Sequence, residues 1–493
     1  MKKEKTKGKT IRKIIAAAVA SAMLIAMCGC SAQNATDTTD TTDTTSVAQD
    51  YLTKADITVN EEITNDQDGE HAIEVSGEEK EYSNVGVTKT GEASGDEADF
   101  YGENSAVFAT EKGTLTIKDS LIETNGTHAN AVFSYGEGTT VNISDSVIET
   151  QGNCSGGLMT TGGGTMNAEN LTIDTSGNSS AAIRSDRGGG TVTVTKGRYT
   201  TAGTGSPVIY STADITVNDA YMESTASQGV VVEGKNSVTL NNATLVADNN
   251  TKNSDKSEYY QAVMIYQSMS GDADEGTSSF SANGSTITNK NGDVFFVNNT
   301  ATKIALSETT ITNEDTDGVF LRAEAAGWGN EGSNGGKVEL TASKQTIEGD
   351  ILVDDVSALN LYLKDSSSFS GAINSDGQKG DVYVEIEDGS TWTLTSDAYV
   401  SGLTVNEGSA IDLNGHKLYV DGKEYEAGAA SKGTAFEIKT ESSGGSGEGG
   451  MLGGKPGDGQ APPDGGQGGP DGNLPSGEPP EKPSGDPPQK PGE

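Results

Sequence analysis

The sequence predicts an all-β fold, a single-stranded parallel β-helix in which each coil of the solenoid contributes three strands. Three observations indicate this fold: an internal repeat, a strict alternation of apolar and polar residues inside each repeat, and the near absence of helical spacing after the first 30 residues. A repeat of 20 to 50 residues indicates one supersecondary unit that buries its apolar side only by stacking on its neighbours. We therefore expect a stack of coils rather than a compact two-layer domain.

The repeat is clearest in GTLTIKDSLIET at 113–124, whose relatives include TTVNISDSVIET at 139–150 and GTVTVTKGRYTT at 190–201. The central apolar residue of each copy marks the register, at Ile117, Ile143, Ala168, Val194, Val217 and Leu240, and later at Ala282, Leu306, Leu340, Leu363 and Ile386. The first five intervals are, by subtraction, 26, 25, 26, 23 and 23 residues. Around each mark the apolar residues have period two, which is typical of a strand with one face turned inward.

Each repeat holds two further strands. A second apolar position follows the mark by five residues, at Ile122, Ile148, Ile173, Tyr199, Met222, Leu245, Ile287 and Ile311. Between the two positions lies an Asp or Asn in most copies (Asp119, Asp145, Asn170, Asp219, Asn242), a residue type that closes turns with its short side chain. A third apolar run precedes each unit, such as AVFSY at 131–135. Three parallel strands per coil form a β-helix that rises about 4.8 Å per coil.

Composition agrees with this fold and excludes some functions. Only 32% of the 493 residues are hydrophobic and 5% aromatic, which is low for a compact domain but sufficient for a thin core column. The net charge of −40 excludes nucleic acid as a partner, because phosphate binding needs a basic surface. Histidines at 71, 128 and 416 are far apart and predict no metal-ligand pair, and Cys154 is alone outside the export signal.

The first 29 residues predict a lipoprotein signal peptide. They contain a basic start, MKKEKTKGKTIRK, then an apolar stretch, and they end before Cys30, which lies between Gly29 and Ser31. We expect lipid attachment at Cys30, with Cys28 as the weaker candidate and plain secretion as the alternative. An acylated cysteine would hold the exported chain on the outer face of the bacterial cell membrane, at the cell surface.

The remaining chain divides by composition. Residues 30–54 are rich in Ser, Thr and Asp and predict a flexible tether, 55–345 predict the regular β-helix, and 346–428 predict a C-terminal β-helical section with a cap. Residues 441–493 are rich in Gly and Pro and predict a disordered tail.

Three insertions, which begin at Asp248, Ser268 and Arg322, interrupt the repeats, and we expect them to emerge as loops on one face. They would lie near one another if they leave the solenoid at the same corner. Tyr259, Tyr260 and Trp328 in these loops are candidates for stacking on sugar rings, with packing against the solenoid as the alternative. Asp272, Asp274 and Glu275 form a candidate calcium loop, with a solvated acidic loop as the alternative. No cofactor other than this calcium is expected.

A candidate for chemistry is the sequence RSDRGGG, which contains Arg184, Asp186 and Arg187. An eliminating lyase needs a cation held by acidic side chains together with an Arg or Lys base. The coils on either side offer Thr160 and Thr161, and Tyr210 and Ser211, and thus no stack of carboxylates. We therefore interpret the three residues as a solvated charge cluster, and the sequence favours a protein without catalytic activity.

Four segments carry a resemblance to a known family: VVVEGKNSVTLNNATL, AVMIYQSMSGDADEG, GWGNEGSNGGKVELTA and GSTWTLTSDAYVSGLTV. With the coils around them, residues 51–420 resemble adhesin-type bacterial surface lipoproteins with right-handed parallel β-helix (pectin-lyase-like) repeats. The resemblance implies right-handed winding and a role at the cell surface, and it supplies no catalytic motif.

Three function hypotheses follow. The favoured one is a lipid-anchored surface protein for adhesion or polysaccharide binding, whose partners are the membrane, through the lipid, and a cell-wall or host polysaccharide or a surface protein. The second is a carbohydrate-active enzyme, a polysaccharide lyase or glycoside hydrolase, acting on acidic polysaccharide. The third is a structural component of the surface layer without a ligand.

Overall fold

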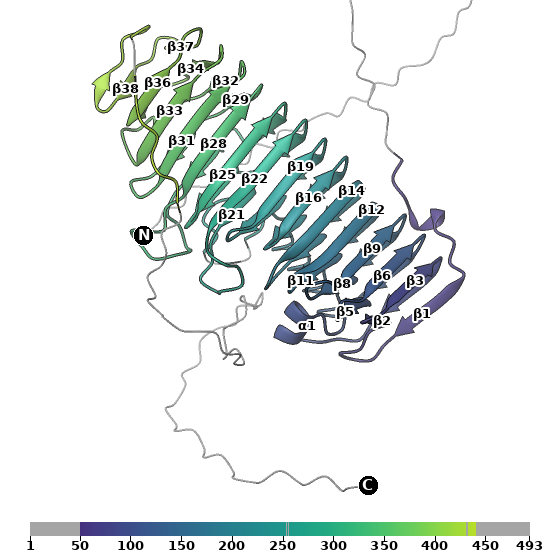
Figure 1. Ribbon diagram of the computed structural model, residues 1–493. Coiled ribbons are helices and arrows are strands. Elements are labelled where there is room, and N and C mark those ends of the chain that lie inside the picture. Colours follow the sequence, from purple (N-terminus) through teal and green to yellow (C-terminus); the bar gives the residue numbers. More distant parts are fainter. Residues whose placement is uncertain (1–49, 253, 255, 430–431, 440–493) are drawn as a thin grey trace, which may run out of the picture. The chain divides into compact units, whose positions relative to one another are not determined.

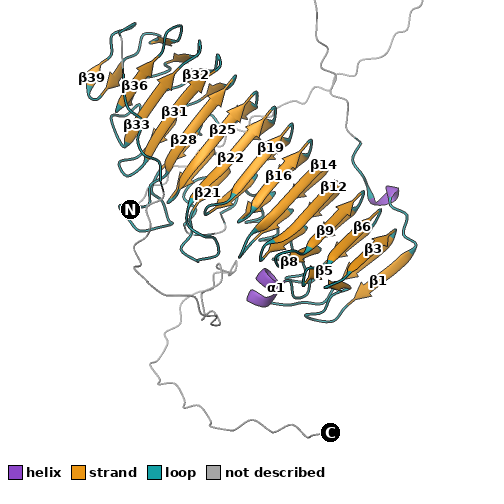
Figure 2. Ribbon diagram, in the orientation of Figure 1, coloured by secondary structure: helices purple, strands orange, loops and turns teal. Residues whose placement is uncertain are grey.

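The computed structural model describes residues 50–252, 254, 256–429 and 432–439. Within these residues the chain winds into successive coils, and the strands of each coil pair with those of the coil before (Figure 1). Every strand pairing in this part is parallel apart from the terminal pair β38–β39. Strands dominate the described chain (Figure 2), and the predicted all-β parallel β-helix is confirmed. The predicted signal peptide at 1–29, Cys30, the tether up to residue 49 and the tail at 441–493 lie outside the described residues.

The strands stack in three columns. Column one contains β3 (Glu79–Ser83), β6 (Thr114–Lys118), β9 (Thr140–Ser144), the first halves of β12 (Gly164–Thr175) and β14 (Gly190–Thr201), β16 (Asp214–Asn218), β19 (Ser237–Asn241), β22 (Thr277–Asn283), β25 (Ala301–Ser307), β28 (Lys337–Ser343), β31 (Ala358–Lys364), β33 (Asp381–Ile386) and β36 (Gly402–Val405). Column two contains β1 (Glu61–Asn65), β4 (Val85–Lys89), β7 (Leu121–Thr124), β10 (Val147–Thr150), the second halves of β12 and β14, β17 (Tyr221–Ser224), β20 (Thr244–Ala247), β23 (Thr286–Asn289), β26 (Thr310–Asn313), β29 (Thr346–Glu348), β32 (Ser368–Ser370), β34 (Thr391–Thr393) and β37 (Ala410–Asp412).

Column three contains β2 (Ile73–Ser76), β5 (Val107–Thr110), β8 (Val132–Tyr135), β11 (Leu158–Thr161), β13 (Ile183–Ser185), β15 (Ile209–Ser211), β18 (Val230–Glu233), β21 (Gln261–Tyr266), β24 (Asp293–Asn298), β27 (Leu321–Ala323), β30 (Ile351–Val353), β35 (Ala398–Val400) and β38 (Leu418–Val420). The last coil ends in β39 (Lys423–Glu424), which pairs with β38 in the antiparallel sense. Strands of the predicted C-terminal section continue the columns, since β28 pairs with β31 and β31 with β33.

The register marks lie one above another, as the repeat predicts. Ile117 pairs with Ile143, and Ile143 pairs with Ala168. All three side chains are buried in one continuous apolar cluster that extends through the coils. One mark is wrong: Leu340 pairs with Ile304, and the residue that continues the column is Ala342, opposite Leu306. The error arises because the insertion before β28 breaks the count, and a period-two strand offers an apolar residue at both positions.

The turn between columns one and two explains the recurring Asp and Asn. Asp119, Asp145, Asn170, Asp219 and Asn242 all have left-handed backbones, with φ between 48° and 54°. Asp and Asn tolerate this conformation better than other residues with a side chain. Their side chains also bond from coil to coil, as where Asn170 Nδ2 donates to Asp145 Oδ1 at 2.7 Å. On the turn before column three, the N–H of Ser155 donates to Ser180 Oγ, and the N–H of Ser180 donates to Ser206 Oγ, each at 2.9 Å.

Two features depart from the regular coil. Residues 95–102, which lie within the stretch predicted as regular β-helix, instead contain the helix α1 (Asp96–Tyr101), which buries Ala98, Asp99 and Phe100 and ends at Gly102 in a left-handed conformation. At the N-terminal end of the described chain, the short helix η1 (Lys54–Asp56) and the residues before it lie along column two: Thr172 Oγ1 donates to the carbonyl of Leu52 at 2.7 Å. The last residues of the expected tether therefore contact the solenoid. Neither helix in the described residues is long and apolar enough to cross a membrane.

The outer face of column three is covered, whereas the outer faces of the other two columns are largely open. All residues of β18 and β21 are buried, although alternate side chains of a strand point to opposite faces. The outward side chains Val231, Met264 and Phe296 form a second apolar cluster with residues of the inserted loops. Helix α1 covers an earlier part of the same face, where Thr161 Oγ1 donates to the carbonyl of Phe100 at 2.7 Å.

The inward column predicts a large difference between neighbouring residues of β6. We expect Ile117→Ala to lower the free energy of unfolding by about 2–5 kcal/mol, because it leaves a cavity between two coils. Thr116→Ala, one residue away on the outer face, is the matched control and should change it by less than about 0.5 kcal/mol. Urea denaturation followed by circular dichroism measures both, and equal effects would contradict the assignment of faces.

Candidate functional site

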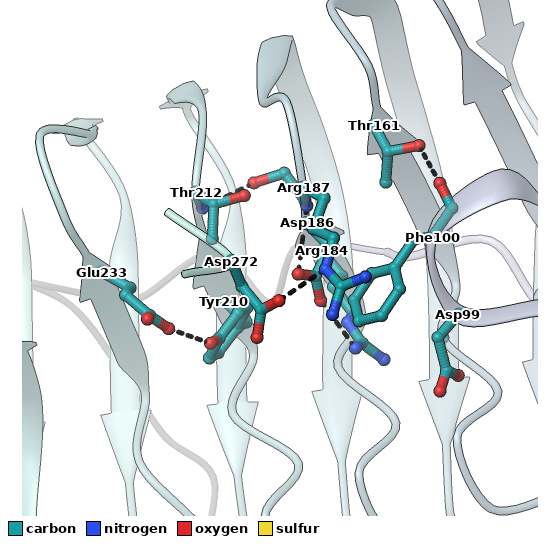
Figure 3. A network of polar contacts seen from close by, with 12 residues as sticks. Asp99, Phe100, Thr161, Arg184, Asp186, Arg187, Tyr210, Thr212, Glu233 and Asp272 are labelled. Atoms are coloured by element: carbon teal, nitrogen blue, oxygen red, sulfur yellow. Dashed lines mark hydrogen bonds and ion pairs between the residues drawn. The ribbon is translucent and has the colours of Figure 1, made fainter. Parts of the chain in front are cut away.

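The covered face of column three brings charged side chains together. Parallel pairing places Met159 beside Arg184, Arg184 beside Tyr210, and Tyr210 beside Val231. A second outward row, two residues further along each strand, contains Thr161, Asp186, Thr212 and Glu233. Figure 3 shows Arg184 and Tyr210 of the first row and all four residues of the second row, together with Phe100 of α1 and Asp272 of an inserted loop. Polar groups at these positions are removed from water, so each needs a partner.

Arg184 and Asp186 form a buried ion pair. Arg184 Nη2 lies 2.8 Å from Asp186 Oδ2, and the side chains are only 11% and 5% exposed. Burial raises the pKa of Asp186 to about 6, and the attraction of Arg184 opposes this shift without cancelling it. Burial also opposes the charge of Arg184, but the carboxylates of Asp186 and Asp99 raise the pKa of its guanidinium overall. Arg184 is therefore a permanent cation that cannot accept a proton.

Glu233 is held by two tyrosines. Its Oε2 accepts hydrogen bonds from the hydroxyls of Tyr266, at 2.9 Å, and Tyr210. Burial raises the pKa of both tyrosines, and the nearby charge of Glu233 adds to the shift. The carboxylate is 1% exposed, and its Oε1 has no hydrogen-bond partner within the described part of the chain.

Arg187 links α1 to the loop at 268–276. Its Nε donates to Asp272 Oδ1 at 2.6 Å and its Nη1 to Asp96 Oδ2 at 3.0 Å. The guanidinium carbon lies 3.7 Å from the ring centroid of Phe100, a cation–π contact. Because Arg187 makes one charge-assisted hydrogen bond to each of the two segments, it fixes the distance between them.

A groove of about 720 Å³ lies along these segments; we call it the α1 groove. It is lined by Asp96, Glu97, Tyr101, Arg187, Gly188, Gly189, Gly190, Thr212, Ala213, Asp214, Lys235, Asn236 and residues 270–274. Glycine is required in its floor: Gly189 has φ of +59°, and a Cβ atom there would lie 2.7 Å from the carbonyl oxygen of Thr212. The RSDRGGG sequence thus supplies both Arg187, which links the two sides of the groove, and the glycines that form the floor of the groove.

The interpretation of Arg184, Asp186 and Arg187 as a solvated cluster is wrong for Arg184 and Asp186, whereas Arg187 is partly exposed. Arg184 and Asp186 are largely buried, and carboxylates surround them. Those carboxylates come from α1, from an insertion and from Glu233, which lies two coils beyond Arg184. Comparing only the two adjacent coils in the sequence could not find them. Alignment of the column-three strands by their register would have placed Glu233 near Arg184. The positions of α1 and of the loop that carries Asp272 could not be predicted from the repeat.

The predicted aromatic residues have different environments. Trp328 packs edge-on against Tyr266 with ring centroids 5.2 Å apart, and Tyr259 packs on Phe296 at 5.5 Å. Both therefore join the second apolar cluster on the covered face. Tyr260 lies apart from this cluster, with Lys252 Nζ 5.4 Å from its ring centroid. The rings of Tyr259 and Trp328 thus contact other side chains of the protein, although both residues remain partly exposed.

The three insertions do not leave at one corner. The loop from Asp248 precedes β21, whereas the loop from Ser268 follows β21. The insertion predicted from Arg322 begins only after Ala323, because Arg322 and Ala323 belong to β27 of column three. The first and third nevertheless meet over the face, since a Cβ atom on Gly327 would lie 2.5 Å from the Cα of Lys256. The loops leave at two corners because column-three strands are flanked by a turn at each end and insertions occur at both.

The acidic loop contacts cationic side chains. Asp272 pairs with Arg187, and Asp274 Oδ2 lies 2.7 Å from Lys235 Nζ. Glu275 follows them directly in the chain. A calcium ion would compete with these two cations, and calcium binding at the loop remains a prediction.

Histidine and cysteine side chains form a cluster that the sequence did not suggest. One ligand atom each from Asp99, His128 and Cys154 lie within 4.8 Å of one another. His71 is elsewhere, with Nδ1 3.0 Å from the carbonyl oxygen of Ser105. The sequence analysis compared the histidines only with one another and therefore did not foresee that His128 lies beside Asp99 and Cys154.

Comparison with known protein families and with curated proteins finds no match to this chain. Function must therefore be argued from the geometry alone.

The Asp186 carboxyl predicts a specific pH dependence. Its pKa is raised to about 6, so between pH 6 and its ordinary value of 3.8 the folded protein holds a proton that the unfolded chain has released. The contribution of Asp186 to the free energy of unfolding therefore rises as the pH falls through this window. We expect the stability of the wild type relative to Asp186→Asn to increase from pH 7 to pH 4.

Urea midpoints at each pH measure this difference. Asp119→Asn, on an exposed turn whose left-handed backbone Asn also adopts, controls for the loss of one carboxylate. A wild-type advantage that stays constant or shrinks as the pH falls would contradict the prediction.

Proposed function

We propose that this protein is a lipid-anchored, non-catalytic surface protein that binds polysaccharide in the α1 groove. The observation that carries the proposal is the convergence of carboxylate, hydroxyl and amide groups with the ring of Tyr101 in one open groove. Sugars offer hydroxyl groups for hydrogen bonding and apolar ring faces for aromatic contact, and a few placed polar groups in a concave site give orientation. Arg187 fixes the width of the groove before a ligand binds, which reduces the entropic cost of binding.

The charge of the groove narrows the ligand class. Five carboxylates, on Asp96, Glu97, Asp214, Asp272 and Asp274, face two cations, on Arg187 and Lys235. Both cations already pair with carboxylates of the groove. An acidic polysaccharide would be repelled by the remaining charge, as it would be by the chain's net charge of −40. Polymers of neutral or amino sugars fit the groove best.

The alternative, a carbohydrate-active enzyme, has less support. A lyase base must lose its proton, and the carboxylates around Arg184 and Arg187 raise the pKa of both guanidinium groups. A hydrolase needs two carboxyl groups that face the scissile bond across an accessible cleft. Asp186 and Glu233 are buried beneath their own hydrogen-bond partners.

The predicted export signal and the predicted lipid attachment at Cys30 support a location at the cell surface, as does the resemblance to adhesin-type lipoproteins. A diacylated cysteine gives stable membrane attachment, which one acyl chain alone does not. The coils would then present the α1 groove to extracellular polymers.

Binding to polysaccharides of defined charge tests the proposal. We expect the purified full chain to bind neutral or amino-sugar polymers and to ignore polygalacturonate on the same array. The double variant Glu97→Gln, Asp214→Asn should weaken binding by roughly 10-fold or more. Both carboxylates are exposed, and the variant loses their charge-assisted hydrogen bonds to the ligand, which together are worth about 1.5–3 kcal/mol. Affinity electrophoresis or calorimetry measures the change.

Two controls locate the site. Asp119→Asn removes a carboxylate far along the coil from the groove and should leave binding intact. Trp328→Ala tests the aromatic loops, and loss of binding in this variant alone would move the site there. Absence of binding to every polymer would count against the proposal, and release of reducing or unsaturated ends would favour the enzyme.

Anchoring makes a separate prediction. In a bacterial host, Cys30→Ser should shift the protein from the membrane fraction to the soluble fraction and abolish incorporation of labelled palmitate, because this substitution removes the acylated thiol. Cys28→Ser, two residues away, should do neither. The reverse pattern would assign the lipid to Cys28, and label in neither protein nor parent would indicate plain secretion.

A further inference from the structure

We propose that Asp99, His128 and Cys154 form a binding site for a divalent transition-metal ion of the zinc type. The three side chains come from three segments: α1 and the turns that precede column three in two successive coils. One potential ligand atom from each lies within 4.8 Å of the other two, and His128 Nδ1 is 2.6 Å from Asp99 Oδ1. Asp99 and His128 are only 8% and 7% exposed, and Cys154 is partly buried.

The winding of the chain accounts for two of the ligands. His128 and Cys154 are 26 residues apart, by subtraction, the same interval as Ile117 and Ile143 in the same two coils. Both have left-handed backbones, with φ of 54° and 55°. Each N–H donates to the next coil, from His128 to the carbonyl of Asn153 and from Cys154 to that of Asn178. Equivalent positions in stacked coils are separated by one strand spacing, about 4.8 Å, which brings the imidazole and the thiol together.

The donor set selects the class of metal. Calcium and magnesium prefer oxygen ligands, whereas thiolate and imidazole together favour zinc and related ions. Three protein ligands with a fourth position open are the arrangement of zinc sites that bind water or a small ligand. Tetrahedral bonds of 2.0–2.3 Å would separate the ligand atoms by roughly 3.3–3.8 Å, so small side-chain rotations from the present positions suffice.

A triangular arrangement also argues against a nucleophilic Cys–His–Asp relay. In such a relay the carboxylate and the thiol contact opposite nitrogens of the imidazole, which would separate them by roughly 7 Å. Here the carboxylate oxygen and the sulfur are within 4.8 Å of each other. The three groups therefore surround a point instead of forming a line.

The surroundings balance the charge of a bound ion. Arg184 is close enough to interact electrostatically with Asp99 and Cys154, but its charge is matched by Asp186 at 2.8 Å. The carboxylate and a thiolate would then neutralise a dication, which lowers the cost of burying it.

Metal titration tests the site. The full chain with Cys28→Ser and Cys30→Ser retains Cys154 as its one thiol. We expect this protein to bind one zinc ion by calorimetry and to show a thiolate-to-metal charge-transfer band with cobalt. Cys154→Ser and His128→Ala should each weaken zinc binding by roughly 100-fold or more, because loss of residues that only hydrogen-bond to metal ligands already weakens binding by up to about 100-fold. The charge-transfer band should vanish in Cys154→Ser.

Matched controls occupy equivalent places. Ser179→Ala changes the turn residue one coil beyond Cys154, with φ of 55°, and His71→Ala removes a partly buried histidine elsewhere; both should bind zinc as the parent does. Circular dichroism establishes that each variant is folded. No zinc binding by the parent, or zinc binding that survives both Cys154→Ser and His128→Ala, would overturn the proposal, as would rapid alkylation of Cys154 that zinc does not slow.

Discussion

Each coil of this protein depends on its neighbours for both its hydrogen bonds and its core. The three strands of one coil belong to different columns and pair with strands of neighbouring coils, so their N–H and C=O groups are satisfied by the coils on either side. Inward side chains such as Ile143 touch the equivalent residue above and below, so one apolar column runs through the stack. The contacts with a neighbouring coil offset the loss of conformational entropy when a coil becomes ordered, as in other solenoids.

This dependence turns position in the repeat into position in space. Residues about 25 apart in sequence become neighbours, and a side chain that suits its turn is repeated along the stack. The serines at 155, 180 and 206 bond from coil to coil in this way, as do Asp145 and Asn170. The same geometry places His128 next to Cys154, although neither is repeated in other coils. A solenoid can therefore build a site from two substitutions at one position of its repeat.

The repeat made the fold predictable from sequence, because the inward rows are encoded by the spacing of Ile117, Ile143 and their equivalents. What could not be predicted depends on segments outside the repeat. The mark at Leu340 fails after an insertion of unknown path, and α1 is too short to show a helical pattern. Asp99, beside His128, and Asp272, beside Arg187, belong to such segments, so their neighbours could not be predicted from the sequence. His128 and Cys154 could have been paired by register, since their separation equals the repeat.

The position of the candidate sites follows from the outward residues of column three. Columns one and two present mainly Thr, Asn and charged side chains to solvent and need no cover. Column three presents Val231, Met264 and Phe296, whose exposure would leave a continuous apolar patch on the surface. Helix α1 and the inserted loops cover this face, and Arg184, Asp186 and Glu233 become buried beneath them and must pair. The cover is assembled from separate segments, and the α1 groove lies where α1 and the loop at 268–276 approach without closing. A ligand that bridges the two segments would complete the cover over this face, and this is the structural reason for proposing that the ligand binds in the α1 groove.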